Sequence, residues 1–138
     1  AVVLDAIRSL ASGFIFTTSM SPVICAGALA SIKYVMDHPV LRRQHQDQAS
    51  KLKEKLISHN FNVHPDTTTH IVPMMVGDSK KCKMISDVLL QDHSIYVQPI
   101  NYPTVPLGTE RLRFTPTHLH TDAMIDHLIE ALRIVFND

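Results

Sequence analysis

Apolar and polar positions follow a helical rhythm in several stretches of this chain, most clearly in residues 39–59. Directly after His38 and Pro39, apolar side chains recur on one stripe, while Arg, Lys, Gln and Glu occupy most of the remaining positions. The stripe is formed by Leu41, Ala49, Leu52 and Leu56. This spacing predicts a long surface helix with one buried face.

Beyond residue 60, short apolar runs alternate with further helical stripes. We expect strands at residues 61–64, 70–76, 95–100 and 110–115, and helices over residues 79–93 and from residue 121 onward. Because Pro73 cannot donate a ladder hydrogen bond, the second strand is expected at an edge or with a bulge. The order strand, strand, helix, strand, strand, helix predicts a small mixed or antiparallel sheet backed by helices.

The stretch before residue 39 is mostly apolar. Residues 13–18, GFIFTT, predict a buried strand or turn. Ser21 and Pro22 then form a typical helix start, with Ser as the N-cap and Pro in the first helical position. Residues 23–36 are apolar and rich in Ala, which predicts a helix buried on most of its sides.

The change of pattern near residue 60 predicts two parts of the chain. Residues 1–60 are expected to form a helical arm, and residues 61–138 a compact α+β domain. The chain begins AVVLDAIRSL, without an initiator Met, a signal peptide or a transit peptide. We therefore expect it to be a fragment of a longer protein.

Composition narrows the classes of function. The 13 Lys and Arg residues balance the 13 Asp and Glu residues, so no basic surface for nucleic acid or an anionic membrane is expected. No apolar run approaches the roughly 20 residues that span a bilayer. Cys25 and Cys82 fit no metal-binding or redox spacing, and we interpret them as reduced thiols of a cytosol-like protein. Only His118 and His120 are close together among the nine histidines, without a third ligand, which argues against a metal site.

A first candidate for anion binding is the run Thr17, Thr18 and Ser19, which precedes the helix expected to start at Pro22. Hydroxyls and backbone N–H groups at such a position either bind an anion or only cap the helix, and both alternatives stay open. No Gly-rich phosphate loop and no Gly-x-Ser-x-Gly motif of hydrolases occurs.

The second candidate is Arg113. In the strand expected at residues 110–115, Leu112 and Phe114 point to the core, so Arg111 and Arg113 point away from it. The loop before this strand, NYPTVP, is stiffened by two prolines. A guanidinium beside a stiff polar loop is suited to bind a carboxylate or phosphate, although an ordinary solvated strand gives the same pattern.

The segment IYVQPINYPTVPLGTERLRFTP, residues 95–116, resembles the C-terminal part of the 5-aminolevulinate synthases, a branch of the α-oxoamine synthase family. The resemblance extends to SGFIFTTSMSP at residues 12–22 and THIVPMMVGD at residues 69–78, and so covers nearly the whole chain. It implies the α/β fold of a fold-type I transferase that depends on pyridoxal 5'-phosphate (PLP). Residues 1–60 would end the large PLP-binding domain, and residues 61–138 would form the small C-terminal α+β domain.

Enzymes of that branch are homodimers that condense glycine with succinyl-CoA to 5-aminolevulinate, CoA and CO2, in the tetrapyrrole pathway that leads to haem. The resemblance implies that Thr17 and Thr18 reach the phosphate of PLP in the neighbouring subunit. It also implies that Arg113 holds the carboxylate of glycine. Thr104, in the loop that closes over the succinyl group, would help to bind the succinyl carboxylate.

This chain departs from the family in two respects. The Schiff-base lysine of the family precedes the GFIFTTS motif and would lie before Ala1, so no catalytic residue is assigned here and the chain alone is expected to be inactive. Leu107 stands where relatives commonly carry a basic residue, so a contact with a CoA phosphate is not supported at this position.

Two alternatives remain: another α-oxoamine synthase with a different acyl-CoA, and a non-enzymatic α+β ligand-binding module. Thr104 favours an acyl chain that ends in a carboxylate. The family occurs in the bacterial cytoplasm and in the mitochondrial matrix of eukaryotes. The sequence QPINYPTVPLGTERLRFTP is closer to the bacterial type of the family. This favours the cytoplasm, with the mitochondrial matrix as the alternative.

Overall fold

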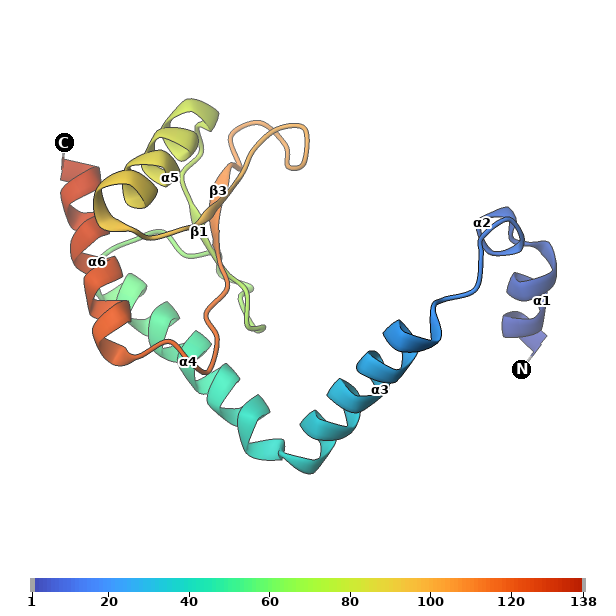
Figure 1. Cartoon of the computed structure of the whole chain (residues 1–138). Coiled ribbons are helices and arrows are strands. Elements are labelled where there is room, and N and C mark those ends of the chain that lie inside the picture. The colour runs from blue at the N-terminus through green and yellow to red at the C-terminus, as the bar shows by residue number, and fades with distance from the viewer. Residues whose placement is uncertain (1, 138) are drawn as a thin grey trace. The chain divides into compact units, whose positions relative to one another are not determined.

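The structure is a computed structural model that describes residues 2–137, without the side chain of Asn137. It consists of two compact units, Ala1–His38, called the N-terminal unit below, and Pro39–Asp138, called the C-terminal unit (Figure 1). No helix among the described residues is both long enough and apolar enough to cross a membrane.

The N-terminal unit contains α1 (Val2–Leu10), α2 (Ser12–Ile15) and α3 (Pro22–Asp37). The predicted helix start at Pro22 is confirmed, since Pro22 occupies the first turn of α3. The strand and the burial predicted from GFIFTT are wrong, whereas the alternative prediction of a turn holds only for the end of the segment, at Phe16. Those residues form the short helix α2 and the turn after it, because Ala11 O accepts hydrogen bonds from the N–H groups of both Phe14 and Ile15.

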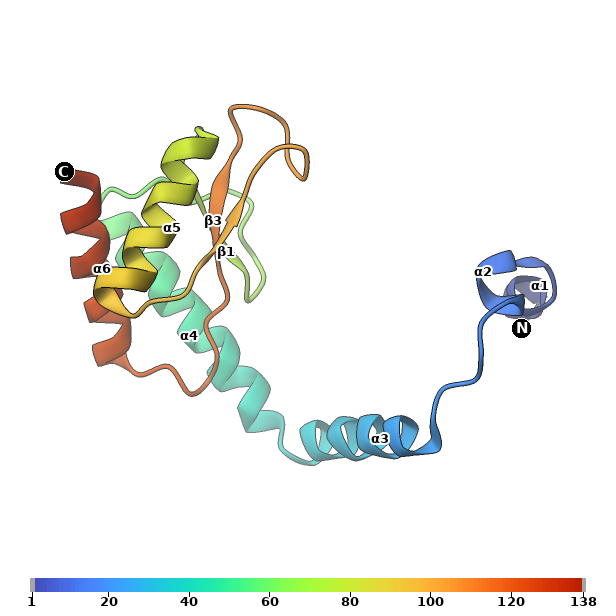
Figure 2. The same cartoon turned by 45° about the horizontal axis from the view of Figure 1, so that its top comes forward.

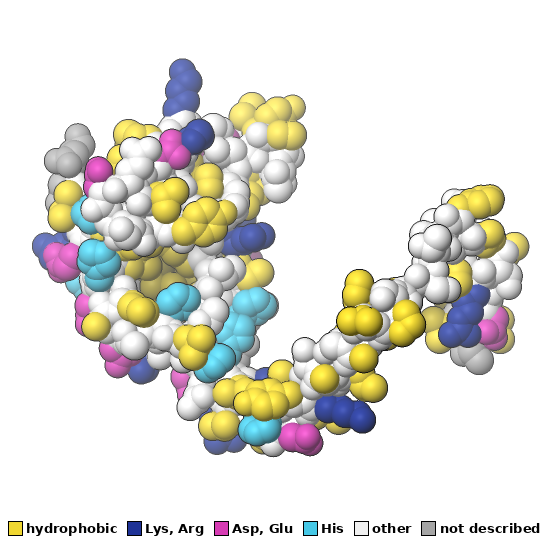
Figure 3. Space-filling model, in the orientation of Figure 1, with side chains coloured by type: hydrophobic (Ala, Val, Ile, Leu, Met, Phe, Trp, Pro, Cys, Tyr) yellow, Lys and Arg dark blue, Asp and Glu magenta, His cyan; other side chains and the backbone are white. Residues whose placement is uncertain are grey.

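The prediction that α3 is buried on most sides is also wrong for this structure. Every residue of α3 is exposed, and apolar side chains cover much of the surface of its unit (Figure 3). An apolar helix needs a covering layer, and within residues 2–38 no second layer of elements packs on α3.

The C-terminal unit is built on a three-stranded antiparallel sheet in the order β1-β3-β2. Its strands are β1 (Val72–Met75), β2 (Gln98–Ile100) and β3 (Arg111–Phe114). The predicted small sheet is confirmed, with β1 at an edge as Pro73 indicated. The strand expected at residues 61–64 shrinks to one bridge, between Val63 and Met74, because the chain turns at His64, whose carbonyl accepts two hydrogen bonds from Thr67.

Three helices lie on the same side of this sheet: α4 (Pro39–Ser58), α5 (Ser79–His93) and α6 (Asp122–Asn137) (Figures 1 and 2). Alternate strand residues point to them and are buried, as period-two strands require. The core between sheet and helices includes Leu52, Leu56, Val72, Met74, Cys82, Ile85, Leu89, Leu112, Phe114, Ile125, Ile129 and Leu132. The other face of the sheet carries Arg111, Arg113 and Gln98 beside the apolar residues Pro73, Met75 and Ile100.

The two compact units divide at residue 38, whereas the sequence pattern indicated a boundary near residue 60. The reason is α4, whose side chains Ala49, Leu52 and Leu56 belong to the core of the C-terminal unit. Ion pairs also join α4 to α6: Lys51 Nζ lies 2.9 Å from Asp122 Oδ1, and Lys55 pairs with Asp126. Because these pairs are largely exposed, apolar burial contributes more than charge to holding α4 in place.

Cys82 gives a direct test of this core. It lies in the first turn of α5 with no exposed surface, and its burial raises the pKa of the thiol above the usual value. With Cys25 replaced by Ser, we expect iodoacetamide at about pH 8 to alkylate native Cys82 at least about tenfold more slowly than the urea-unfolded chain. Mass spectrometry of timed samples measures this, and equal rates would contradict the buried position.

Candidate anion site on the open face of the sheet

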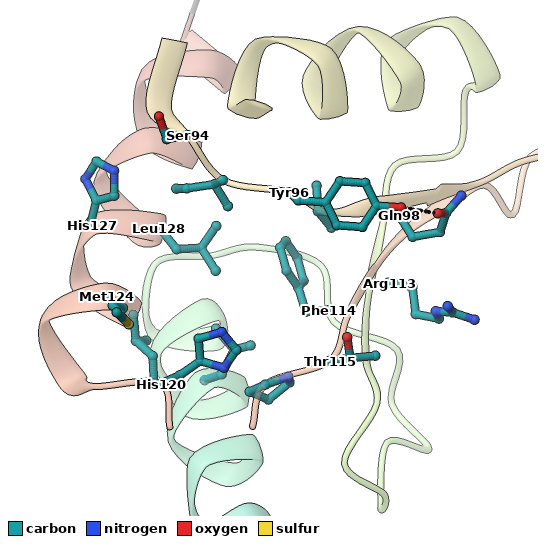
Figure 4. Close-up of a pocket in the computed structure, with 15 residues that line it drawn as sticks. Ser94, Tyr96, Gln98, Arg113, Phe114, Thr115, His120, Met124, His127 and Leu128 are labelled. Carbon is teal, nitrogen blue, oxygen red and sulfur yellow. Dashed lines mark hydrogen bonds between the residues drawn. The ribbon is translucent and has the colours of Figure 1, made fainter. Parts of the chain in front are cut away.

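Arg113 lies on β3, the central strand of the sheet. Leu112 and Phe114 on either side of it are buried, whereas the Arg113 side chain is exposed, so the predicted alternation is confirmed. Figure 4 shows the Phe114 side chain directed towards Leu128 and His120 and the Arg113 side chain directed away from them, although both residues line the pocket drawn there. A central strand is held by hydrogen bonds on both sides, which fixes the base of this guanidinium group.

The neighbours of Arg113 across the sheet are Pro73 on β1 and Gln98 on β2. The Gln98 Oε1 atom accepts a hydrogen bond of 2.7 Å from the hydroxyl of Tyr96, and its Nε2 donates to Pro99 O at 3.2 Å. Arg113 takes part in none of the ion pairs or side-chain hydrogen bonds formed within residues 2–137. Its guanidinium therefore faces solvent with all its N–H donors available to an external anion.

Gln98 was not predicted as a neighbour of Arg113. The sequence indicates a strand at residues 95–100, but which of its residues faces Arg113 depends on the register between two strands. The pairing of Gln98 with Arg113 fixes that register.

Residues 101–110 join β2 to β3, and residues 101–109, which include Thr104, are called the loop below. Thr104 is exposed, and its N–H donates to Asn101 O at 2.9 Å. At the other end of the loop, Thr109 donates from its N–H and its hydroxyl to Pro106 O, at 3.1 and 2.7 Å. The loop thus has internal turns of its own, while its tip, including Leu107, is open to solvent.

Thr17 and Thr18 lie in the N-terminal unit, between α2 and α3, and both are exposed. The Thr17 hydroxyl donates to Phe14 O at 3.0 Å, so it closes the end of α2. Neither threonine caps α3, whose N-cap is Ser21, and the first turn of α3 carries no acidic side chain. The hydroxyl groups of Thr17 and Thr18 can donate hydrogen bonds, and no acidic side chain in the first turn of α3 would repel an anion. This segment is therefore suited to bind an anion such as a phosphate group.

The pocket in Figure 4 lies beside β2 and β3 and has a volume of about 580 Å³. Phe114, Met124 and Leu128 give it an apolar wall, and His120 and His127 lie among its polar lining. Figure 3 shows histidine side chains around this hollowed part of the surface. The sequence did not predict the pocket, because its walls come from segments that are distant along the chain.

Histidines in this region have structural roles. His120 Nδ1 accepts a hydrogen bond of 2.7 Å from Thr117 N, and His127 Nε2 lies 3.1 Å from His93 O. Within residues 2–137, no group of three or more His, Cys, Asp or Glu side chains is arranged to hold a metal ion.

The sequence model of the family described as Aminotransferase class I and II matches residues 1–132. The chain belongs to this family. Its fold is that of the C-terminal part of a fold-type I transferase, which agrees with the fold expected from the sequence.

Among curated proteins, the chain is similar to the 5-aminolevulinate synthase of Rhizobium meliloti, with 53% identity over 137 residues, 99% of this chain and 34% of the relative. It is 53% identical over 132 residues to 5-aminolevulinate synthase 1 of Cereibacter sphaeroides, covering 96% of this chain and 32% of that protein. The mitochondrial 5-aminolevulinate synthase of Neurospora crassa is 49% identical over 138 residues, 100% of this chain and 22% of its own length. The chain thus spans about a third of the length of its bacterial relatives.

Among solved structures, the chain resembles a serine palmitoyltransferase from S. paucimobilis with a bound PLP–myriocin aldimine, with a TM-score of 0.86 and 28% identity. That match covers 96% of this chain and 33% of the other. An 8-amino-7-oxononanoate synthase from Francisella tularensis shares the fold, with a TM-score of 0.77 over 99% of this chain and 38% of its own, at 20% identity.

Proposed function

We propose that the full-length protein carrying this chain is a PLP-dependent 5-aminolevulinate synthase, which condenses glycine with succinyl-CoA to 5-aminolevulinate, CoA and CO2. The observation that carries the proposal is the identity of about one residue in two to 5-aminolevulinate synthases along nearly the whole chain. Because the chain spans only about a third of those proteins, the activity is proposed for the full-length protein.

PLP supplies the electron sink for the carbanion that forms when a bond to the amino-acid α-carbon breaks. In the proposed site, Thr17 and Thr18 donate hydrogen bonds to the phosphate group of PLP. Their exposure and the absence of acidic side chains from the first turn of α3 support this role. The Schiff-base lysine, expected upstream of Ala1, stays a prediction.

Arg113 is proposed to hold the carboxylate of glycine. A guanidinium binds a carboxylate through two parallel N–H···O hydrogen bonds, which fixes the plane of the substrate as well as its position. The exposed position of Arg113 on the central strand, without an acidic partner in the described residues, supports this role. Such an anchor lets the protein orient the bond that is to be broken.

Thr104 is proposed to bind the carboxylate of the succinyl group. The loop at residues 101–109 would close over the acyl-CoA and exclude water from the reacting atoms, and its opening would limit product release. The exposed hydroxyl of Thr104 and the internal turns of the loop support a preformed element that moves as a whole.

The full-length protein is further proposed to be a homodimer in which Thr17 and Thr18 serve the site of the partner subunit. Its expected location is the bacterial cytoplasm, with the mitochondrial matrix as the alternative. The bacterial relatives support the cytoplasm, and the fungal relatives, which are named as mitochondrial, support the matrix.

The preferred acyl donor tests the proposal. We expect the full-length protein, loaded with PLP and supplied with glycine, to turn over succinyl-CoA at least about tenfold faster than acetyl-CoA, because only the succinyl group offers a carboxylate to Thr104. CoA release and 5-aminolevulinate formation are measured in parallel.

The structural similarity to serine palmitoyltransferase favours a second candidate, an α-oxoamine synthase with another acyl-CoA. Palmitoyl-CoA with serine therefore belongs in the same assay. If palmitoyl-CoA with serine, or acetyl-CoA with glycine, were turned over faster than succinyl-CoA with glycine, the proposal of succinyl-CoA as the acyl donor would be wrong. The proposed class of reaction would stay the same.

A further inference from the structure

The first residue of the loop at residues 101–109 and the residue that follows the loop are both hydrogen-bonded to Ser79, the first residue of α5. Asn101, where the loop begins, donates from Nδ2 to Ser79 O at 3.3 Å. Glu110, which directly follows the loop, accepts at Oε1 a hydrogen bond of 3.0 Å from the Ser79 hydroxyl. The base of the loop is therefore fastened to the N-terminal end of a core helix.

Glu110 is unusual in being a buried carboxylate. Only 1% of its surface is exposed, and it is the one charged residue among the buried side chains of the described chain. Its carbonyl accepts hydrogen bonds from Val76 N and Gly77 N, at 2.9 and 3.0 Å, so its backbone is fixed as well. Burial of a charge is costly unless it has compensating partners. The Ser79 hydroxyl and the positive end of the α5 dipole offset part of this cost at Oε1. The other carboxylate oxygen, Oε2, is buried without a hydrogen-bond partner in the described residues, so the bond from Ser79 is the one side-chain hydrogen bond that holds this carboxylate.

The turn before α5 also lies against the far end of the loop. A side chain at Gly77 would bring its Cβ 3.5 Å from Gly108 O, and both glycines have positive φ, 77° for Gly77 and 81° for Gly108. The contacts of the loop with the core thus concentrate at its two ends. Its tip, from Tyr102 to Leu107, is largely exposed.

We propose that Ser79 and Glu110 are positioning residues that act as the hinge of this loop and set the position of Thr104 over the acyl donor. The proposal rests on the proposed function, in which the loop closes over succinyl-CoA. Neither residue needs to touch the substrate. The hydrogen bond from the Ser79 hydroxyl to Glu110 holds the end of the loop, and the one from Asn101 to Ser79 O holds its start. Together they keep the two ends of the loop at one place, so that the tip moves as one body when it closes.

The experiment uses the full-length, PLP-loaded protein with Ser79→Ala, Ser79→Thr and Glu110→Gln. The matched control is Ser86→Ala, because Ser86 is a buried serine on the same helix whose hydroxyl donates to Val97 O at 2.8 Å, away from the loop. Two readouts are taken: hydrogen exchange of the amides of residues 102–109 without substrate, and kcat and KM for each substrate.

We expect Ser79→Ala to speed exchange of the loop amides by roughly tenfold and to raise the KM for succinyl-CoA by roughly tenfold, the effect of losing one hydrogen bond to a charged group. The KM for glycine should change by less than about twofold, since Arg113 lies on the sheet and not on the loop. Ser79→Thr should restore both values, because it keeps the hydroxyl. Glu110→Gln keeps an acceptor for the Ser79 hydroxyl. Its loop exchange rate and its KM for succinyl-CoA should therefore lie between those of the original protein and those of Ser79→Ala.

Unchanged loop exchange in both Ser79→Ala and Glu110→Gln would overturn the hinge, as would equal acceleration in Ser86→Ala. If the unmodified protein does not turn over glycine with succinyl-CoA, the proposed function fails. The exchange measurement still decides the hinge in that case, because it needs no substrate.

Discussion

Replacing Arg113 with Leu in the full-length protein is expected to raise the KM for glycine by about a hundredfold or more and to leave the unfolding transition nearly unchanged. Each charge-assisted hydrogen bond contributes roughly 1.5–3 kcal/mol, and in the proposed site Arg113→Leu would remove two of them from the glycine carboxylate. Folding is spared because the side chain is exposed and has no ion pair in the described residues. Steady-state kinetics and urea unfolding of the same preparations measure the two effects.

Two further variants separate a carboxylate clamp from a general effect of charge. Arg113→Lys keeps the charge but offers one ammonium group in place of the planar fork, so its KM should lie between those of the original protein and Arg113→Leu. Arg111→Leu removes a guanidinium from the same strand and the same face, two positions away. A similar rise in KM for Arg111→Leu and Arg113→Leu would argue against a specific role of Arg113.

Sequence patterns correctly predict those helices and strands whose local signals agree with their surroundings in the fold. The apolar stripe of α4, the helix over residues 79–93 and the period-two pattern of β3 rest on local signals, and each appears in the structure close to its predicted position. The helix α3 shows what a local pattern does not contain. An apolar helix indicates that a covering surface is needed, but it does not identify that surface, and within residues 2–38 no element covers α3.

The candidate site divides in the same way. That Arg113 points away from the core follows from alternation along one strand. The hydrogen bond between Ser79 and Glu110 joins residues 31 positions apart, and the pairing of Gln98 with Arg113 depends on strand register. No local period encodes such contacts, since they form only when the sheet and the helices pack together. The parts of the site that sequence reasoning missed are therefore those held by long-range packing.

Replacing Leu56 with Ala in this chain is expected to lower the free energy of unfolding of the C-terminal unit by about 2–5 kcal/mol. Leu56 has no exposed surface, and it belongs to the stripe by which α4 joins the core. Its truncation removes apolar burial and leaves a cavity that a close-packed interior fills only in part. Urea unfolding followed by far-UV circular dichroism measures the loss.

Ile57→Ala is the matched control, because Ile57 is the next residue of the same helix and 51% of its surface is exposed. A change within about 0.5 kcal/mol is expected there, as for most surface positions. If Leu56→Ala were as mild as Ile57→Ala, α4 would not be part of the C-terminal core, and a boundary near residue 60 would again describe the chain better. A large loss at Leu56 alone would support the division at residue 38, since the stability of the sheet and α6 would then depend on a side chain that lies before residue 60.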